Sequence, residues 1–312
     1  MARKHNFSAS DGKSIHYYSW IPRTDTDAVI LIIHGMAEHG GRYDKFAKFL
    51  NGRGFSVYAP DLRGHGETIA ETSEQGFFAE ENGWFRVVAD LEEFVDVIRE
   101  REGDKPIIVL GHSMGSLLAR TLLIMHPALF HAAVLLGTAA SPGLLGKAGK
   151  VLARLAVRRK GARFPNKRLD EMSFGAYAKA FEPARTKFDW ITRDPVEVDS
   201  YIEDPLCGFV MTSRFYIDLL DGLDFIHNRK RLLGMNMDMP VLILSGSKDP
   251  VGDMGKGVRK VAQMLKEAGM KRLDVELYED ARHNLVHETN RREVEEHIEA
   301  WIRSTLDSDE AI

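Results

Sequence analysis

One serine in the chain has the flanking residues of a nucleophile. Residues 111–115 read GHSMG, a GxSxG motif centred on Ser113. An apolar run at 106–110 precedes the motif and a run with helical spacing at 114–125 follows it, which predicts a strand-to-helix turn. Such a turn requires small flanking residues and lifts the hydroxyl above the sheet beside a helix N-terminus. The alternative is a glycine-rich turn whose serine only caps the helix, but this context favours a nucleophile.

Two residues much later in the chain could activate this serine. A serine hydroxyl is a weak nucleophile unless a histidine takes its proton and a carboxylate orients that histidine. Asp249 follows an apolar run at 241–245 and precedes a proline, and His283 lies in the loop after the next such run, at 273–278. The order Ser, Asp, His is the one expected around a turn of this kind. We therefore predict a catalytic triad of Ser113, Asp249 and His283.

Each of the two later roles has a rival. Asp253 could replace Asp249 as the acid, but it lies farther from the end of the strand. His287 could replace His283 as the base, although it lies four residues on, where a helix is expected to begin. Loop position favours the first candidate in both cases. Several histidines precede the acid in the chain and are expected to be structural or to support the site, rather than to act as the general base: His39, His65, His112 and His126.

The site also needs groups that stabilise negative charge. A tetrahedral intermediate requires two backbone N–H groups directed at its oxyanion. One is expected from Met114, which follows the nucleophile, and the other from the loop after an earlier strand. Residues 34–36 read HGM after such a strand, so Met36 is the second expected donor. Gly35 and His112 are expected to line the substrate site beside these donors. The alternative is that the His-Gly pair only makes a tight turn.

Alternating strands and helices must position these residues. Short apolar, β-branched runs are typical of buried parallel strands, and they alternate with segments of helical spacing. The predicted strands are 14–20, 28–33, 55–59, 106–110, 132–136, 241–245 and 273–278. The predicted helices are 43–51, 85–100, 114–125, 258–268 and 292–306. Repeated strand–helix units predict an α/β fold with a mostly parallel, doubly wound sheet and helices on both faces.

The alternation stops in the middle of the chain. Residues 141–226 are helical or irregular, with few runs that resemble strands. We interpret residues 141–235 as a helical cap, or lid, inserted into a core formed by residues 1–140 and 236–312. Such an insertion would lie over the C-terminal edge of the sheet, where open α/β folds bind their ligands.

The first part of this cap has an unusual charge pattern. Residues 147–168 contain basic side chains and no acidic one, and apolar residues recur there at helical spacing: Leu145, Ala148, Val151, Leu152 and Leu155. One hypothesis is that residues 145–168 form a basic amphipathic helix that rests on anionic lipid and admits single-chain lipids. The alternative is a solvated cap helix whose apolar stripe packs on the core.

Composition excludes several other classes. The 312 residues are 44% hydrophobic with a formal net charge of −4, so no nucleic-acid partner is expected. Cys207 is the single cysteine and lies in an apolar stretch, where a small buried residue is expected rather than a nucleophile. No residues have metal-ligand spacing, so neither a metal nor a cofactor is expected. No apolar run approaches the roughly 20 residues of a membrane span, and the N-terminus lacks the apolar part of a secretory signal. The expected location is the cytoplasm, and the hypothesis for residues 145–168 adds peripheral contact with a membrane.

Four segments together resemble the monoacylglycerol lipase and lysophospholipase branch of the α/β hydrolases. They are HGMAEHGGRY at 34–43, DLRGHG at 61–66, GHSMG at 111–115 and GSKD at 246–249. The likeness covers the sheet domain at both ends of the chain. In that family, the residues matching Met36 and Met114 supply the oxyanion hole, and those matching Ser113, Asp249 and His283 form the triad.

The same resemblance implies a mobile cap between the sixth and seventh core strands that shapes an acyl tunnel. The cap of this chain is longer and more basic than the resemblance leads us to expect, so the family's glycerol-facing residues are not carried over. The expected substrate is a small-molecule ester or single-chain lipid: a monoacylglycerol, a lysophospholipid or a simpler acyl ester.

Other functions stay open beside lipid ester hydrolysis. A general short-chain carboxylesterase would use the same residues. An amidase or aminopeptidase is less favoured because the HGGPG signature of proline iminopeptidases is absent. A binding scaffold without activity would usually lack a triad member, and all three are present here. Dehalogenases and epoxide hydrolases need an aspartate where this chain has Ser113.

Overall fold

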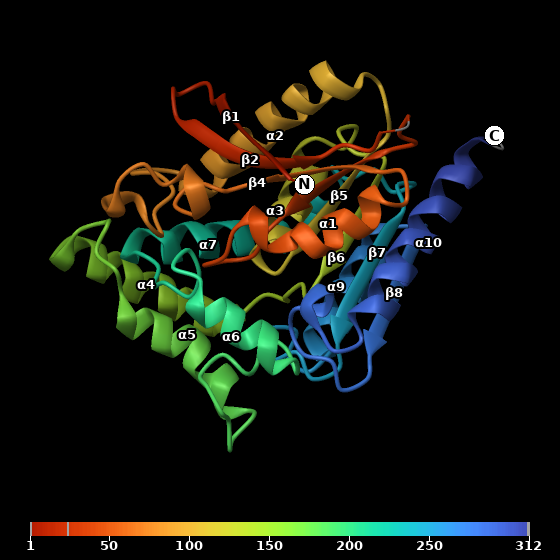
Figure 1. Ribbon diagram of the computed structural model, residues 1–312. Helices are drawn as coiled ribbons and strands as arrows, with labels where there is room; N and C mark the ends of the chain where they lie inside the picture. Colours follow the sequence, from red (N-terminus) through yellow and green to blue (C-terminus); the bar gives the residue numbers. More distant parts are fainter. Residues whose placement is uncertain (1, 24, 311–312) are drawn as a thin grey trace.

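The computed structural model describes residues 2–23 and 25–310, which are built around one eight-stranded sheet (Figure 1). The strands lie in the order β1-β2-β4-β3-β5-β6-β7-β8. β2 pairs antiparallel with β1 and β4, and the other neighbouring strands pair parallel. The strands are β1 (Arg3–Ser8), β2 (Ser14–Trp20), β3 (Val29–Ile33), β4 (Ser56–Pro60), β5 (Ile107–His112), β6 (Ala132–Leu136), β7 (Val241–Gly246) and β8 (Leu273–Tyr278).

Helices connect these strands and cover the sheet. The α-helices are α1 (Asp44–Asn51), α2 (Gly83–Glu102), α3 (Met114–Met125), α4 (Gly143–Lys160), α5 (Lys167–Lys179), α6 (Pro195–Glu203), α7 (Ser213–Ile226), α8 (Arg229–Leu232), α9 (Lys256–Ala268) and α10 (Arg291–Glu310). Short 3-10 helices occur at Gly40–Tyr43, Gly66–Thr68, Thr72–Glu74 and Leu285–His287.

Alternating side chains of the central strands divide between two apolar cores. Val29, Leu31 and Ile33 of β3 belong to the core that contains α2, α3 and α9. Ile30 and Ile32 of the same strand belong to the other core, with α1 and α10. Helices therefore cover both faces of the sheet, as right-handed crossovers between parallel strands require. The predicted α/β fold class, a mostly parallel sheet flanked by helices, is confirmed.

The sequence pattern did not predict one strand. β1 has the mostly polar sequence RKHNFS and pairs only with β2, at the edge of the sheet. An edge strand tolerates polar side chains on its exposed face, so it lacks the apolar signal of a buried strand. The other predicted strands and helices occur with bounds within four residues of those expected.

The segment between β6 and β7 contains five helices, α4 to α8. In Figure 1, α4, α5 and α6 gather on one side of the molecule. α7 contacts both α4 and α3, and so it links these helices to the core. The predicted limits of the cap, residues 141 and 235, fall in the connections before α4 and after α8; these limits stay a prediction.

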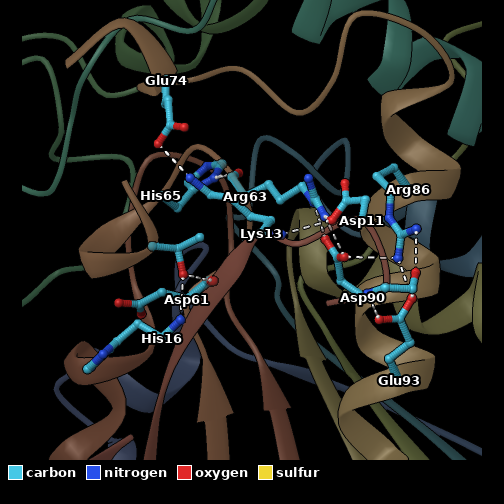
Figure 2. Close-up of polar contacts among 12 residues, drawn as sticks. Asp11, Lys13, His16, Asp61, Arg63, His65, Glu74, Arg86, Asp90 and Glu93 are labelled. Atoms are coloured by element: carbon cyan, nitrogen blue, oxygen red, sulfur yellow. Dashed lines mark hydrogen bonds and ion pairs between the residues drawn. The ribbon is translucent and has the colours of Figure 1, made fainter. Parts of the chain in front are cut away.

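Ion pairs around the buried Arg63 and Asp90 side chains hold the loop after β4 in place (Figure 2). Arg63 Nη2 lies 2.9 Å from Asp90 Oδ1 on α2 and 2.7 Å from Asp11 Oδ1 in the β1–β2 turn. Arg86 Nη2 is 3.1 Å from the same Asp90 oxygen. Because these charges are joined in one network, the loop, the hairpin and α2 support one another.

The same loop supports the loop after β3. The Asp61 carboxylate accepts the Gly40 N–H at 2.7 Å and the Glu67 N–H at 2.8 Å. The Leu62 N–H donates to His34 Nε2 at 3.0 Å. The DLRGHG segment thus has a structural role here: it fixes the HGM loop that follows β3.

Candidate active site

Ser113 lies on a sharp turn between β5 and α3. Its φ of 51° and ψ of −118° are strained for a residue with a side chain. The turn is packed so closely that a Cβ on Gly111 would lie 2.4 Å from the Gly115 carbonyl oxygen. A Cβ on Gly115 would lie 2.0 Å from the Ile33 carbonyl oxygen at the end of β3. The glycines of the motif are therefore required by close backbone approach.

Asp249 and His283 meet at the C-terminal edge of the sheet. His283 Nδ1 lies 3.0 Å from Asp249 Oδ1, and both side chains are buried. Burial alone would raise the pKa of Asp249, but the neighbouring His283 and hydrogen bonds from Ser245 and Val251 lower that pKa below its ordinary value. The carboxylate is then ionised and can only accept, so His283 Nδ1 must carry the proton. With the proton on Nδ1, Nε2 is the ring nitrogen that can act as a base.

Ser113 and His283 line one cavity, together with Gly35, Met36 and His112. The His283 ring contacts two other rings: its centroid is 4.8 Å from that of His112 and 5.3 Å from that of Trp190. The structure thus brings together residues that the sequence placed on four different segments.

The two rivals lie elsewhere. Asp253 is exposed in the turn before α9 and has a φ of 52°. His287 is buried, with Nδ1 3.0 Å from Asn284 Oδ1 and Nε2 3.1 Å from the Arg42 carbonyl oxygen. Burial lowers the pKa of His287 to about 3, so it stays neutral. In the neutral ring Nε2 donates to the Arg42 carbonyl, so Nδ1 is the acceptor toward the Asn284 side-chain amide, and both nitrogens are engaged.

The expected oxyanion donors also face the cavity. Met36 and Met114 line it, and neither backbone N–H has a hydrogen-bond acceptor among the residues that the structure describes. The Gly35 N–H, by contrast, donates to Glu38 Oε1 at 2.6 Å. Two free N–H groups beside Ser113 could donate hydrogen bonds to an oxyanion formed there.

Glu38 organises this loop, and our sequence analysis did not assign it a role. Besides the Gly35 N–H, its carboxylate accepts the Tyr43 hydroxyl at 2.8 Å, His112 Nδ1 at 3.0 Å and Arg42 Nε at 3.1 Å. Burial opposes its ionisation, but the His112 hydrogen bond and the nearby charges hold the pKa of Glu38 well below its ordinary value. The Glu, Arg and Tyr of the HGMAEHGGRY segment were the residues from which this role of Glu38 could have been predicted.

The rest of the cavity is mostly apolar. It holds about 790 Å³ of empty space, including its open mouth. Side chains from the cap and from α3 supply much of the lining: Leu117, Ala139, Phe174, Tyr177, Trp190, Ile191, Leu219, Leu223 and Val251. Polar groups at the wall are contributed by Glu38, Tyr201 and Asn284 as well as the triad region. Such a lining suits a ligand with an apolar chain and a small polar group.

One group of side chains among the described residues has the spacing of metal ligands. Atoms of His39, Asp204 and Cys207 lie within 4.8 Å of one another. His39 Nε2 is already 2.9 Å from Asp204 Oδ2, and the Arg42 cation acts on the Cys207 thiol. Cys207 is half-buried, rather than fully buried as expected, and burial raises the pKa of its thiol. The thiol is therefore neutral and a poor nucleophile.

Comparison with known proteins agrees with this arrangement. The family described as serine aminopeptidase, S33, matches residues 24–290. A monoglyceride lipase of Mus musculus is 30% identical over 280 residues, covering 88% of this chain and 82% of the relative. A monoacylglycerol lipase of Mycolicibacterium smegmatis is 29% identical over 320 residues, covering 97% and 98%. A solved carboxyl esterase from Bacillus coagulans, in complex with glycerol, has a TM-score of 0.90 at 26% identity and covers 98% of this chain and 99% of that one. The chain therefore belongs to the serine aminopeptidase S33 family and has its α/β-hydrolase fold.

Proposed function

We propose that the protein is a serine-dependent carboxylic ester hydrolase that acts on monoacylglycerols or similar single-chain lipid esters. The observation that carries this proposal is one cavity in which a serine on a strained turn, a buried histidine–aspartate pair and an apolar wall meet. The likeness to monoglyceride lipases over most of the chain supports the same substrate class.

In the proposed reaction, Ser113 Oγ attacks the ester carbonyl carbon while His283 Nε2 takes the hydroxyl proton. Asp249 stabilises the imidazolium that forms. The Met36 and Met114 N–H groups bind the oxyanion, and the loss of one such donor typically costs roughly 10²–10³ in turnover. His283 then gives its proton to the departing alcohol, which leaves an acyl ester on Ser113. Water, deprotonated by His283, releases the fatty acid and restores the serine.

The cavity wall favours an ester over an amino-terminal peptide. An aminopeptidase would need an unpaired carboxylate to hold the substrate's ammonium group. Among the described residues that line the cavity, Glu38 is the acidic one, and its oxygens already accept four hydrogen bonds. A short-chain carboxylesterase with a closed cap is the second candidate, since it requires the same chemistry and a smaller acyl space.

The test is a substrate series with purified protein. It runs from p-nitrophenyl acetate to palmitate, with 1-monooleoylglycerol and an aminoacyl p-nitroanilide alongside and Ser113→Ala as the control. Activity that depends on Ser113 and rises with chain length, with cleavage of the monoacylglycerol, is expected. Cleavage of short esters alone would favour the carboxylesterase. Cleavage of the anilide without ester turnover would contradict the proposal and indicate a peptidase.

We also propose that α4 brings the enzyme to anionic membranes. Leu144, Leu145 and Val151 of α4 are 81%, 83% and 63% exposed, so this apolar stripe does not pack on the core. Lys150 pairs with acidic residues of α7, but α4 carries other basic side chains: Lys147, Arg154, Arg158, Arg159 and Lys160. Exposed leucines beside cations that form no ion pair with the residues the structure describes favour an anionic lipid surface.

Vesicle co-sedimentation tests this contact. Within the described residues, no helix is long and apolar enough to cross a membrane. The protein is expected to sediment with anionic vesicles at low salt, and the double variant Leu144→Gln/Leu145→Gln is expected to stay in solution. Val196→Gln on α6, where the side chain is 70% exposed, is the matched control. If the parent protein does not bind at low salt, the membrane contact is wrong.

A further inference from the structure

One short cap segment is hydrogen-bonded to the loop that carries His283. This wall segment, residues 189–193, lies between α5 and α6. The Asn284 N–H donates to the Ile191 carbonyl at 2.7 Å, and the Thr192 hydroxyl donates to the His287 carbonyl at 2.9 Å. Arg282 Nη1 donates to the Thr192 carbonyl at 3.3 Å. The histidine loop and this part of the cap therefore form one hydrogen-bonded unit.

Glu288 lies at the centre of that unit. Its side chain is fully buried. One carboxylate oxygen accepts the backbone N–H of Arg282 at 2.8 Å and that of Arg193 at 3.1 Å. The other accepts Arg193 Nε and the Thr289 N–H, both at 2.9 Å. A buried carboxylate is stable only when it is paired and hydrogen-bonded, and here its donors come from both segments.

The wall segment reaches the reacting groups through Trp190. Trp190 and Ile191 line the cavity, and the centroid of the Trp190 ring lies 5.3 Å from that of His283. Arg282, whose N–H binds Glu288, immediately precedes His283 in the chain. A shift of either segment would change the contact between the imidazole and the Trp190 ring.

We propose that Glu288 is a positioning residue that holds the His283 loop and the wall segment together as one body. It thereby sets both the orientation of the catalytic base and the position of the cavity wall at Trp190. This inference rests on the proposed function. Glu288 acts through Arg282 and Trp190 and does not touch the substrate. The wall segment is consequently a fixed part of the pocket, even if the helices before it move to admit substrate.

The test replaces the carboxylate by an amide. In Glu288→Gln, the new NH₂ group faces one of the N–H donors that the carboxylate accepted, so the two segments separate. We expect kcat for p-nitrophenyl butyrate to fall by about 10- to 100-fold, because small displacements of a base are costly, while KM changes less than about threefold. The rate at which a fluorophosphonate labels Ser113 should fall in parallel, because that rate also depends on the base. Each rate is divided by the fraction of folded protein, which thermal denaturation of each variant gives.

Glu295→Gln is the matched control, because Glu295 is a buried carboxylate on α10 whose nearest cation is Arg292 at 4.0 Å. It should keep the parent kinetics.

If Glu288→Gln does not fold, Arg193→Met replaces it. This variant should slow fluorophosphonate labelling at least about threefold, since the wall segment loses its guanidinium contact with Glu288. Parent-like kinetics in a folded Glu288 variant, or a loss that matches its unfolded fraction, would overturn the positioning role. A parent protein without esterase activity would contradict the proposed function, yet the labelling rates would still test the positioning role.

Discussion

Replacing Gly115 by alanine tests the close packing behind the nucleophile. The added Cβ would lie 2.0 Å from the Ile33 carbonyl oxygen and 2.7 Å from that of His34, whereas ordinary contacts begin at 3.4 Å. Both neighbours are backbone atoms, so no flexible side chain can move aside. The start of α3 and the end of β3 must therefore separate by about 1.4 Å, a displacement that overpacked sites resist at a cost of roughly 1–3 kcal/mol.

This separation acts on the two proposed oxyanion donors. Met36 follows the end of β3, and Met114 begins α3, so the added methyl group moves their N–H groups apart. A hydrogen bond of about 2.9 Å lengthened by that amount is lost. We expect kcat to fall by at least about 100-fold, as it does when one oxyanion donor is removed, with KM changing only a few-fold.

The assay measures kcat and KM on p-nitrophenyl butyrate, together with thermal denaturation. Gly175→Ala in α5 is the matched control, because a Cβ there meets nothing within 4 Å. It should keep full activity and gain up to about 1 kcal/mol of helix stability. A Gly115→Ala protein with kcat within threefold of the parent value and an unchanged melting temperature would show that the packing argument is wrong.

Three further predictions follow from buried charges. Asp249→Asn should lower kcat roughly 10³–10⁴-fold at unchanged fold, because an amide no longer selects the His283 tautomer; parent-like turnover would contradict the triad. Arg63→Met leaves the buried Asp90 carboxylate without its main partner and should lower the free energy of unfolding in urea by about 3 kcal/mol; an unchanged urea midpoint would contradict this. Stability should also decline below pH 6.5, because burial lowers the pKa of four histidines to about 3 or 4 and only the unfolded chain binds those protons: His34, His65, His227 and His287. At pH 5.5 each of these histidines should lower the free energy of unfolding by about 1.4 kcal/mol. Asp61 and Asp218 offset only part of this loss, because burial raises their pKa to about 6 and the folded chain then binds the protons. Equal urea midpoints at pH 7.5 and pH 5.5 would refute this prediction.

The sequence by itself indicated most of the sheet and the candidate reacting residues. Apolar β-branched runs and helical spacing are local signals, so they indicated the parallel strands and the turn at Ser113 without any tertiary contact. Asp249 and His283 could be named because each follows a strand, and the C-terminal ends of parallel strands meet at one edge of a sheet. β1 was missed because an edge strand needs no apolar pattern.

Only the tertiary structure decided how these residues are held and what surrounds them. Glu38 contacts His112, 74 positions away, and Glu288 contacts Arg193, 95 positions away; both contacts depend on loops that have no periodic pattern. The exposure of the apolar stripe on α4 likewise depends on which side of the helix meets α7, and spacing alone left both alternatives open. Local pattern is thus sufficient where strands and helices are regular, whereas the orientation of the base and the shape of the pocket come from packing between irregular segments far apart in the chain.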